Sequence, residues 1–399
     1  MVVRIMIGDP KKSIDTIAGK NRIIANIVEL MLTRENFLLI GHKSPDEDCV
    51  SSLVGFGLLL SKFGKGPIIY MSHIMSKQFD YMLDICRFNS IRVVTSFKEG
   101  EHPVDVIAVI DTPKPSMVDA SPAIQRMLHD ETMLKMEIDH HIGADGAYNG
   151  SDGYCLVTEA SAAAELVGHL AMKLNDRTEL LRRYQITELF SRNLVLSLLT
   201  GIIADTNMGQ YLKSRRERRY YEIFSNMFNT MLAKETVKDS NFANMNQVFA
   251  ELKHLSSNEE RCFRTMLKMR KKSESVYYVV LDEEAANKMF KEHDHETIVS
   301  VSRTVTDRLA NDSGRLGLVC YYDDSKHSDL IQFRMRRNPS YKGYDLRNIL
   351  SLLAIENGGG HEGAIGFRIP KSAVSDLKEY VASIIPKIEG ALSAADAAH

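Results

Sequence analysis

Two histidines directly follow an aspartate at residues 139–141, where an apolar run ends. Residues 134–138 alternate apolar side chains with Lys135 and Glu137, a pattern typical of a short β-strand. A carboxylate and two imidazoles are metal ligands, and α/β folds place their chemistry at the carboxyl ends of strands. Because such a triplet also occurs in ordinary surface turns, it indicates a site only together with other clusters.

Three further clusters of possible ligands follow apolar runs in the same chain. They are His42 with Asp46 and Asp48, then Asp111, then Asp205. Taken alone, Asp48 could equally cap the helix that follows it, and Asp111 could be a turn former. Four such run ends, interpreted here as strand ends, favour one shared metal site.

The ligand types indicate which metal and which reaction. Carboxylate oxygens mixed with imidazoles suit Mn²⁺, with Mg²⁺, Co²⁺ or Fe²⁺ also possible, better than the thiolate-rich sites that zinc prefers. Four aspartates and two or three histidines exceed what one ion needs. Two ions about 3.5–4 Å apart, bridged by a carboxylate and a water, would activate that water against a phosphoryl group. Hydrolysis of a phosphoester is therefore the hypothesis.

The elements that must position these residues predict an α/β protein of two domains, because 399 residues exceed the usual single-domain length. The first domain should hold a mainly parallel sheet flanked by helices, the second should be a smaller α/β unit, and a helical connector should join them. We expect a helix over about 11–36. The predicted segments are an N-terminal helical extension (1–34), the metal-binding domain (35–215), the connector (216–274), the second domain (275–390) and a fraying tail (391–399).

Composition excludes several classes of protein. Lys plus Arg number 50 against 52 Asp plus Glu, so the net charge of −2 gives no global bias toward nucleic acid or membrane. The five cysteines are scattered and form no C-x-x-C pair, which excludes a disulfide framework and a zinc knuckle and favours a reducing cytoplasm. No run approaches the ~18 apolar residues of a membrane-spanning helix, so we expect neither insertion nor export.

The second domain carries its own candidate anion site. Gly358, Gly359 and Gly360 precede His361; consecutive glycines let backbone amides approach an anion, although they can also form a flexible turn. Arg334 and Arg336 lie two apart on a predicted strand and so share a face, where they either grip a phosphate or are solvated. The basic residues of 213–219 favour a solvated helix face over a polyanion screen.

The motifs resemble, in order, those of the DHH phosphoesterase family, in the branch that carries the DHH-associated C-terminal domain. His42-x-x-x-Asp46-x-Asp48 is similar to the family's first motif, Asp111 to its second and Asp139-His140-His141 to its third. Thr200-Gly-Ile-x-x-Asp205-Thr206 resembles the fourth motif, and Gly358-Gly-Gly-His361 resembles the C-terminal signature. The resemblance implies that 35–215 is the catalytic domain and 275–390 the substrate-binding domain.

The resemblance also implies the role of each residue. His42, Asp46 and Asp111 would hold one Mn²⁺, and Asp48, Asp111, His140 and Asp205 the second, with Asp111 bridging. His141 would face the scissile phosphate and Asp139 would orient its neighbours. In the C-terminal domain the implied substrate ligands are His361, the glycines before it, and either Arg334 or Arg336.

The resemblance implies a Mn²⁺-dependent phosphodiesterase or phosphatase that converts short oligoribonucleotides, linear dinucleotides or nucleotide bisphosphates to mononucleotides. Alternatives are a cyclic di-AMP phosphodiesterase, a manganese inorganic pyrophosphatase or a non-catalytic RNA-binding protein. The expected partner is a short RNA or small nucleotide, with no membrane and no long duplex; a homodimer is possible. Three residues depart from the family pattern, which affects the expected substrate preference: Glu47, Ser51 and Asn207 stand where small residues or glycine are common.

Overall fold

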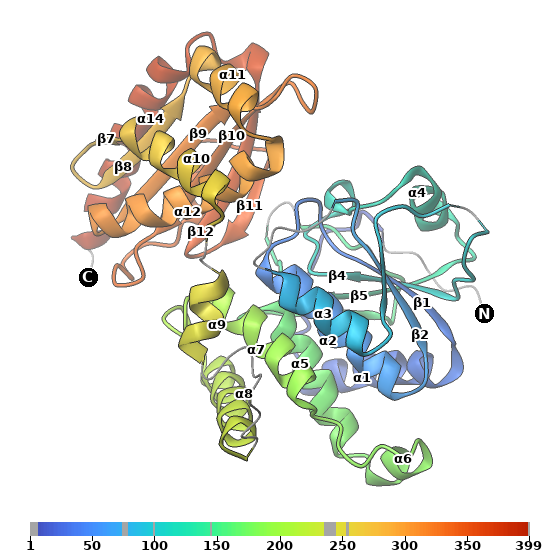
Figure 1. Ribbon diagram of the computed structural model, residues 1–399. Coiled ribbons are helices and arrows are strands. Elements are labelled where there is room, and N and C mark those ends of the chain that lie inside the picture. The colour runs from blue at the N-terminus through green and yellow to red at the C-terminus, as the bar shows by residue number, and fades with distance from the viewer. Residues whose placement is uncertain are drawn as a thin grey trace. The chain divides into compact units, whose positions relative to one another are not determined.

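The computed structural model describes residues 7–73, 79–98, 100–143, 146–234, 245–252 and 255–397. The chain divides into two compact units, Met1–His254 and Leu255–His399, and each is built on its own six-stranded sheet (Figure 1). The division falls inside the segment 216–274 that the sequence predicts to be a connector. No helix among the described residues is long and apolar enough to cross a membrane.

The first unit holds a parallel sheet of strand order β3-β2-β1-β4-β5-β6. Its central strands are buried on both faces, which explains their continuous apolar sequences. The α/β class with a parallel sheet is thus confirmed. The strands are β1 (Asn36–Ile40), β2 (Gly66–Tyr70), β3 (Arg92–Val94), β4 (Val106–Ile110), β5 (Leu134–Asp139) and β6 (Cys155–Val157).

Helices cover both faces of this sheet. One face packs in a large apolar cluster with α1, α2, α3, α5, α7 and α8, and the other face packs with α4. The helices of the unit are α1 (Ile17–Thr33), α2 (Glu47–Lys62), α3 (Asp80–Phe88), α4 (Pro122–His129), α5 (Ala163–Asn175), α6 (Thr178–Arg183), α7 (Arg192–Asp205), α8 (Arg215–Lys234) and α9 (Met245–Leu252), with a 3-10 turn η2 (Pro115–Met117).

The first helix begins later than the sequence predicts. We expected a helix from about residue 11, but Thr16 caps α1 by accepting a hydrogen bond from the Gly19 amide (3.0 Å). Residues 8–14 are not helical: Pro10 forms an isolated antiparallel bridge with Ala147. This segment therefore lies along the loop that follows the histidine pair.

The second unit holds a mixed sheet of strand order β11-β12-β10-β9-β8-β7, in which β8 and β9 pair in parallel and the other neighbours pair antiparallel. Its strands are β7 (Lys271–Lys272), β8 (Val276–Leu281), β9 (Leu316–Tyr322), β10 (Leu330–Arg337), β11 (Gly358–His361) and β12 (Ala364–Pro370). The expected second α/β unit is confirmed, and the glycine run forms the edge strand β11.

The helices of the second unit pack in two separate apolar clusters. One cluster contains residues of α10, α11 and α12, and the other contains residues of α13 and α14. These helices are α10 (Ser257–Lys268), α11 (Glu283–Glu292), α12 (His295–Ser313), α13 (Arg347–Leu352) and α14 (Leu377–Asp396), with a 3-10 turn η3 (Lys371–Ala373). The prediction that the tail frays from residue 391 is wrong up to Asp396, because α14 continues there and buries Leu392.

Candidate metal centre

The candidate ligands meet at the carboxyl edge of the parallel sheet. Strands β1, β4 and β5 are neighbours, so the residues that follow them, 41–48, 111 and 140–141, come together. The strand order reverses direction at β1 and β4, which is where ligands bind in open α/β sheets. Asp205 reaches the same place as the last residue of helix α7, so the interpretation of its apolar run as a strand is wrong.

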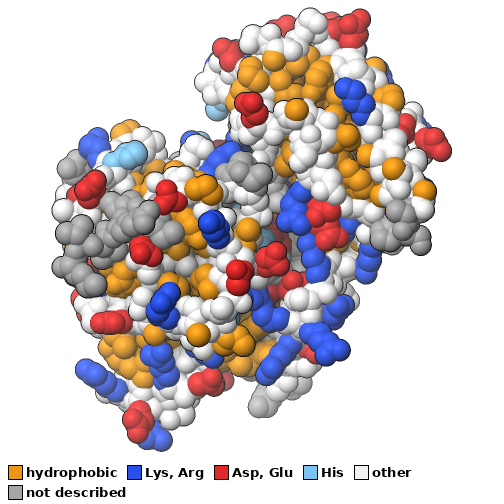
Figure 2. Space-filling model, turned by 180° about the vertical axis from the view of Figure 1, so that it is seen from behind, with side chains coloured by type: hydrophobic (Ala, Val, Ile, Leu, Met, Phe, Trp, Pro, Cys, Tyr) orange, Lys and Arg blue, Asp and Glu red, His pale blue; other side chains and the backbone are white. Residues whose placement is uncertain are grey.

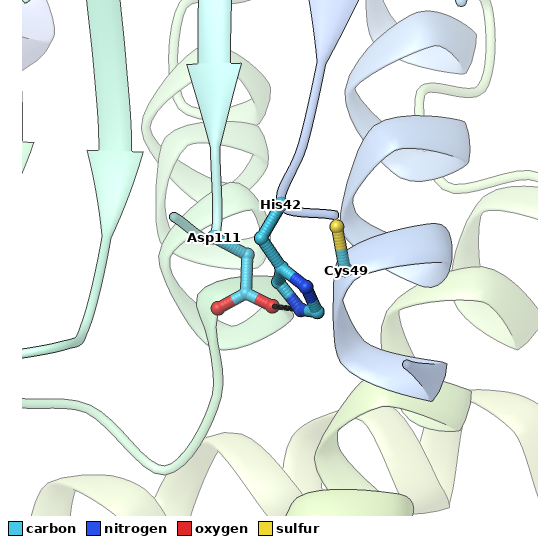
Figure 3. Close-up of side chains that lie close together, drawn as sticks. All are labelled: His42, Cys49 and Asp111. Carbon is cyan, nitrogen blue, oxygen red and sulfur yellow. Dashed lines mark ion pairs between the residues drawn. The ribbon is translucent and has the colours of Figure 1, made fainter. Parts of the chain in front are cut away.

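His42 lies beside two carboxylates. Its Nε2 is 3.5 Å from Asp46 Oδ1 and 3.7 Å from Asp111 Oδ2, and its Nδ1 is 2.9 Å from the Lys43 carbonyl oxygen. A carbonyl only accepts, so Nδ1 carries a proton, and Nε2 is the ring nitrogen that faces the carboxylates. Figure 3 shows the imidazole and the Asp111 carboxylate pointing toward each other. This is the arrangement that a shared cation needs.

His140 lies among three more carboxylate contacts. Its Nε2 is 3.4 Å from Asp111 Oδ1, 3.6 Å from Asp205 Oδ2 and 3.7 Å from Asp48 Oδ2. Its Nδ1 is 3.2 Å from the Ala160 carbonyl oxygen, which again leaves Nε2 as the free ring nitrogen. Asp111 therefore directs one oxygen toward His42 and the other toward His140.

The donor set fits divalent cations. Asp111 Oδ1 and His140 Nε2 are fully buried and have no hydrogen-bond partner among the described residues. Burial, with the charge of Asp111, raises the pKa of Asp48 to about 7, and burial raises the pKa of Asp205 well above its ordinary value. Burial alone would lower the pKa of His42, but Asp46 and Asp111 outweigh it and raise that pKa to about 9. These groups therefore bind protons more tightly than they would in water, and divalent cations would neutralise the same carboxylate charge.

The start of helix α5 fixes Asp48. The amides of Ala163 and Ala164 donate to its two oxygens at 2.6 and 3.0 Å, and Ser52 Oγ donates at 3.1 Å. Asp48 does not cap its own helix, because the N-cap of α2 is Asp46. The cap interpretation of Asp48 is therefore wrong, and its carboxylate is held at the centre of the site.

The basic cluster 213–219 is only partly a solvated helix face. Arg216 Nε donates to Glu165 Oε1 at 2.9 Å, and its Nη2 donates to the Glu159 carbonyl oxygen at 2.6 Å. The fully buried Glu165 in turn accepts from the amide and hydroxyl of Ser161. Arg216 thus fixes the segment that also supplies the Ala160 carbonyl to His140.

Backbone conformation explains two residues of the motifs. Asp111 has φ +52°, a left-handed conformation that side chains other than asparagine, aspartate and glycine rarely adopt. Asn207 has φ +46°, a left-handed conformation that asparagine adopts at low cost. The departure at Asn207 therefore preserves the backbone after the fourth motif.

Gly201 of the fourth motif is required by close packing, which gives a testable prediction. A Cβ at this position would lie 2.5 Å from Asp48 Oδ1 and 2.6 Å from the Ala164 side chain. We expect Gly201→Ala to displace the Asp48 carboxylate, to weaken Mn²⁺ binding about tenfold or more, and to lower the free energy of unfolding by about 1–3 kcal/mol. Electron paramagnetic resonance titration with Mn²⁺ and chemical denaturation measure the two effects.

The matched control is Gly57→Ala in helix α2. Its added Cβ would meet only side chains, at 3.5 Å or more, so metal affinity should not change and stability should rise by up to ~1 kcal/mol. Equal Mn²⁺ affinity in the Gly201→Ala and wild-type proteins would show that the steric argument is wrong.

Asp139 lies behind the ligands and orients His141. Its Oδ1 accepts from the His141 amide at 3.1 Å and lies 2.8 Å from His141 Nδ1. Burial would raise the pKa of Asp139, but Lys11 and His141 outweigh it, so this pKa lies below its usual range. A charged Asp139 fixes the Nδ1–H tautomer of His141, whose ring is partly exposed.

The sequence interpretation missed two residues of the site. Lys11 reaches Asp139 from the segment that was predicted to be helical. Cys49 lies beside His42 and Asp111, with potential ligand atoms within 4.8 Å of one another (Figure 3). Burial raises the pKa of the Cys49 thiol, and its Sγ packs against Gly41. A search for cysteine pairs could not find it.

The predicted substrate ligands lie in the second unit. The half-buried face of β10 carries Arg334 and Arg336, as expected from their spacing. Arg336 Nε lies 3.5 Å from Asp307 Oδ1, whereas Arg334 Nε is buried without a hydrogen-bond partner among the described residues. Gly366 pairs with both Arg334 and Gly359 across the sheet. The His361 side chain lies outside the described residues.

Residues 36–202 match the sequence model of the DHH family, N-terminal domain. The first unit therefore carries a domain of the DHH phosphoesterase family, as its motifs predicted, and this family hydrolyses phosphoester bonds. Members of this family are metal-dependent, which agrees with the acidic cluster described above. No curated protein matches the chain in sequence.

Solved structures show how far the fold is shared. An exopolyphosphatase-related protein from Bacteroides fragilis is 16% identical, covers 94% of this chain and 98% of its own, and superposes with a TM-score of 0.64. RecJ with Mn²⁺ from Thermus thermophilus is 14% identical; the match covers 96% of this chain and 56% of RecJ, with a TM-score of 0.44. The pGpG-specific phosphodiesterase PggH from Vibrio cholerae is 12% identical, with coverages of 91% and 99% and a TM-score of 0.32. The first shares the fold over nearly the whole chain.

Proposed function

We propose that this protein is a two-metal, Mn²⁺-dependent phosphoesterase that hydrolyses short oligoribonucleotides, linear dinucleotides or nucleotide bisphosphates to mononucleotides. The observation that supports it best is Asp111, whose two oxygens face two different histidine groups 3.4–3.7 Å away. A single carboxylate shared between two ligand sets is typical of sites in which two ions act on one phosphate.

The chain's own residues would divide the work as follows. His42 and Asp46 would hold one ion, Asp48, His140 and Asp205 would hold the other, and Asp111 would be a ligand of both. When bound, the ions would ionise a water and neutralise charge on the phosphoryl oxygens. Mg²⁺ or Co²⁺ could replace Mn²⁺ at such oxygen-rich ligands.

His141 and Asp139 would act on the phosphate itself. His141 Nδ1 contacts Asp139, so when the ring also carries a proton on Nε2, that Nε2–H would donate a hydrogen bond to a phosphoryl oxygen. The Asp139 carboxylate stabilises a positive charge on the ring as the phosphoryl group gains negative charge. The water oxygen would then bond to phosphorus, the P–O bond to the leaving nucleotide would break, and a proton from the attacking water would end on the leaving oxygen.

The second unit would bind an anionic group of the substrate. Burial, together with the charges of Arg303 and Arg368, lowers the pKa of Arg334 to about 10. An anion would relieve the repulsion among these guanidinium groups, and the glycines opposite Arg334 leave space for it. Figure 2 shows basic and acidic side chains intermixed on one face of the molecule, which favours a short substrate over a long polyanion.

Arg334→Ala is expected to raise KM for pApA about tenfold to a hundredfold with little change in kcat, because it removes a charge-assisted hydrogen bond in the bound state. Arg336→Ala is the matched control: its side chain already lies beside Asp307, so KM should change less. His361→Ala should also raise KM. Steady-state kinetics measure both parameters, and a larger effect at Arg336 would reverse the assignment.

A side-by-side assay tests the proposed function. Wild-type protein with Mn²⁺ is offered pApA, 3′-phosphoadenosine 5′-phosphate, cyclic di-AMP, a long single-stranded RNA and pyrophosphate. We expect selective hydrolysis of the two short linear nucleotides. Preference for cyclic di-AMP would favour a cyclic di-AMP phosphodiesterase. Cleavage of pyrophosphate alone would favour a pyrophosphatase, and binding of RNA without turnover would favour a non-catalytic RNA-binding protein.

A further inference from the structure

Residues 8–14 form a strap across the end of the parallel sheet. The Gly8 amide donates to the Tyr148 carbonyl (3.0 Å), and the Tyr148 amide donates to the Asp9 carbonyl (2.9 Å). The Lys11 amide donates to the Gly146 carbonyl at 2.8 Å, and the Ile14 amide to the Val157 carbonyl at 3.0 Å. These bonds hold the strap in one register and direct the Lys11 side chain inward.

The Lys11 ammonium group is fully buried behind the metal centre. Its Nζ lies 2.8 Å from Glu137 Oε1, donates to the Thr112 carbonyl at 2.6 Å, and donates to Asp139 Oδ2. The side chains of Lys11, Glu137 and Asp139 have no exposed area. A buried ammonium ion persists only where such partners replace its water, so these three oxygens hold it in one place.

The contacts of Lys11 lead both to the Asp139–His141 pair and to the turn that carries Asp111. Asp139 gives Oδ2 to Lys11 and Oδ1 to His141, so Lys11 sets the rotation of the carboxylate that orients the imidazole. Thr112 directly follows Asp111, so its carbonyl anchors the left-handed turn on which the bridging carboxylate stands.

We infer that Lys11 is a positioning residue of the active site and that the strap is a part of the catalytic machinery, not a passive extension. This inference rests on the proposed function only for its effect on turnover. Lys11 does not touch substrate; it acts through Asp139 and through the Thr112 carbonyl. The buried Glu137 completes the pocket, because Asn149 and Gly150 amides also donate to it and fix the second carboxylate beside the ammonium.

Chemical rescue tests this role. Lys11→Ala should lower kcat for the best short nucleotide about 10- to 100-fold with KM nearly unchanged, as for other residues that orient a catalytic group. The deleted atoms correspond to propylammonium, which should restore much of kcat at millimolar concentration, whereas uncharged propanol should not. Lys12→Ala, at the exposed neighbouring position, should keep wild-type kcat.

A second readout does not depend on turnover. The measurement is an NMR spectrum of protein that carries ¹⁵N-labelled histidine and is loaded with Mg²⁺. The His141 ring signal is the one that disappears in His141→Gln, and its chemical shift should report the Nδ1–H tautomer. Lys11→Met, which keeps the length and removes the charge, should shift this signal while the protein remains folded. If the wild type hydrolyses none of the nucleotides, the proposed function fails, but this spectrum still tests Lys11. An unchanged His141 signal in Lys11→Met, or an unrescued loss of kcat in folded Lys11→Ala, would overturn the inference.

Discussion

Asp111→Asn and Asp111→Ala should each lower kcat/KM by about a thousandfold or more, the largest effect that we expect from a single substitution. The carboxylate faces His42 through Oδ2 at 3.7 Å, and through Oδ1 it faces His140 and His141 at 3.4 and 3.3 Å. If Asp111 is the shared ligand that we propose, loss of its charge would remove a ligand from both ions at once. Metal ions contribute several kcal/mol to transition-state stabilisation, and about 4 kcal/mol corresponds to a thousandfold in rate.

The two variants separate charge from backbone strain. Asparagine tolerates the φ of +52° at this position, whereas alanine adds about 1–2 kcal/mol of strain in the left-handed region. If the bridging carboxylate carries the effect, both variants lose activity although Asp111→Asn keeps its stability. Mn²⁺ titrations should show weakened binding of both ions.

Asp105→Ala provides the control at the other end of β4. Asp105 accepts from the amides of Asn36 (2.9 Å) and Glu35 (3.1 Å), so its loss should lower the free energy of unfolding by about 1 kcal/mol and leave kcat unchanged. Turnover near the wild-type level in Asp111→Asn would show that the metal assignment is wrong.

The residues that follow the strands could be predicted from sequence because periodicity places them. Continuous apolar runs at 37–40 and 106–110 require strands buried on both faces, and parallel strands bring the residues after them to one edge. His42, Asp111 and His140 were found in this way. Asp205 comes from a helix: its apolar run was interpreted as a strand, which is wrong, but its position at the end of that run and its motif both indicated the same cluster.

Lys11 could not be predicted, because its partners are distant in sequence. Its side-chain contacts lie 101 and 128 residues away, and a lysine in a polar N-terminal segment has the sequence signature of an exposed residue. The start of α1 at Ile17 depends on the Thr16 cap, which the apolar pattern of the helix does not reveal. Hydrogen bonds between distant segments decided the first outcome, and a local capping bond decided the second.

The preference for Arg334 over Arg336 also required the structure. Both positions alternate onto the same face of β10, so spacing alone treats them alike. The difference arises from Asp307 of α12, which lies beside Arg336, and from Arg303 and Arg368, whose charges act on Arg334. Sheet register and helix packing determine these neighbours.

Removal of the metal should make stability strongly dependent on pH. In the metal-free protein the pKa of Asp48 is raised from 3.8 to about 7, and that of His42 from 6.5 to about 9. At both groups the folded state therefore binds more protons than the unfolded state between the two values. Stability must fall as pH rises through about 4 to 7 for Asp48 and about 6.5 to 9 for His42.

Added Mn²⁺ should reverse this trend, because the same ligands exchange protons for metal and the exchange becomes easier as pH rises. At a free Mn²⁺ concentration a hundred times Kd, each ion contributes about 2.7 kcal/mol to the free energy of unfolding. Chemical denaturation of chelator-treated and Mn²⁺-loaded protein at about pH 6 and pH 8 measures, at each pH, the difference in the free energy of unfolding between the two forms. We expect that difference to widen from pH 6 to pH 8 and to be small at both in Asp111→Ala. A difference that narrows with rising pH would mean that the buried carboxylates and His42 do not bind the ions, because protons compete with the ions for these ligands less as pH rises.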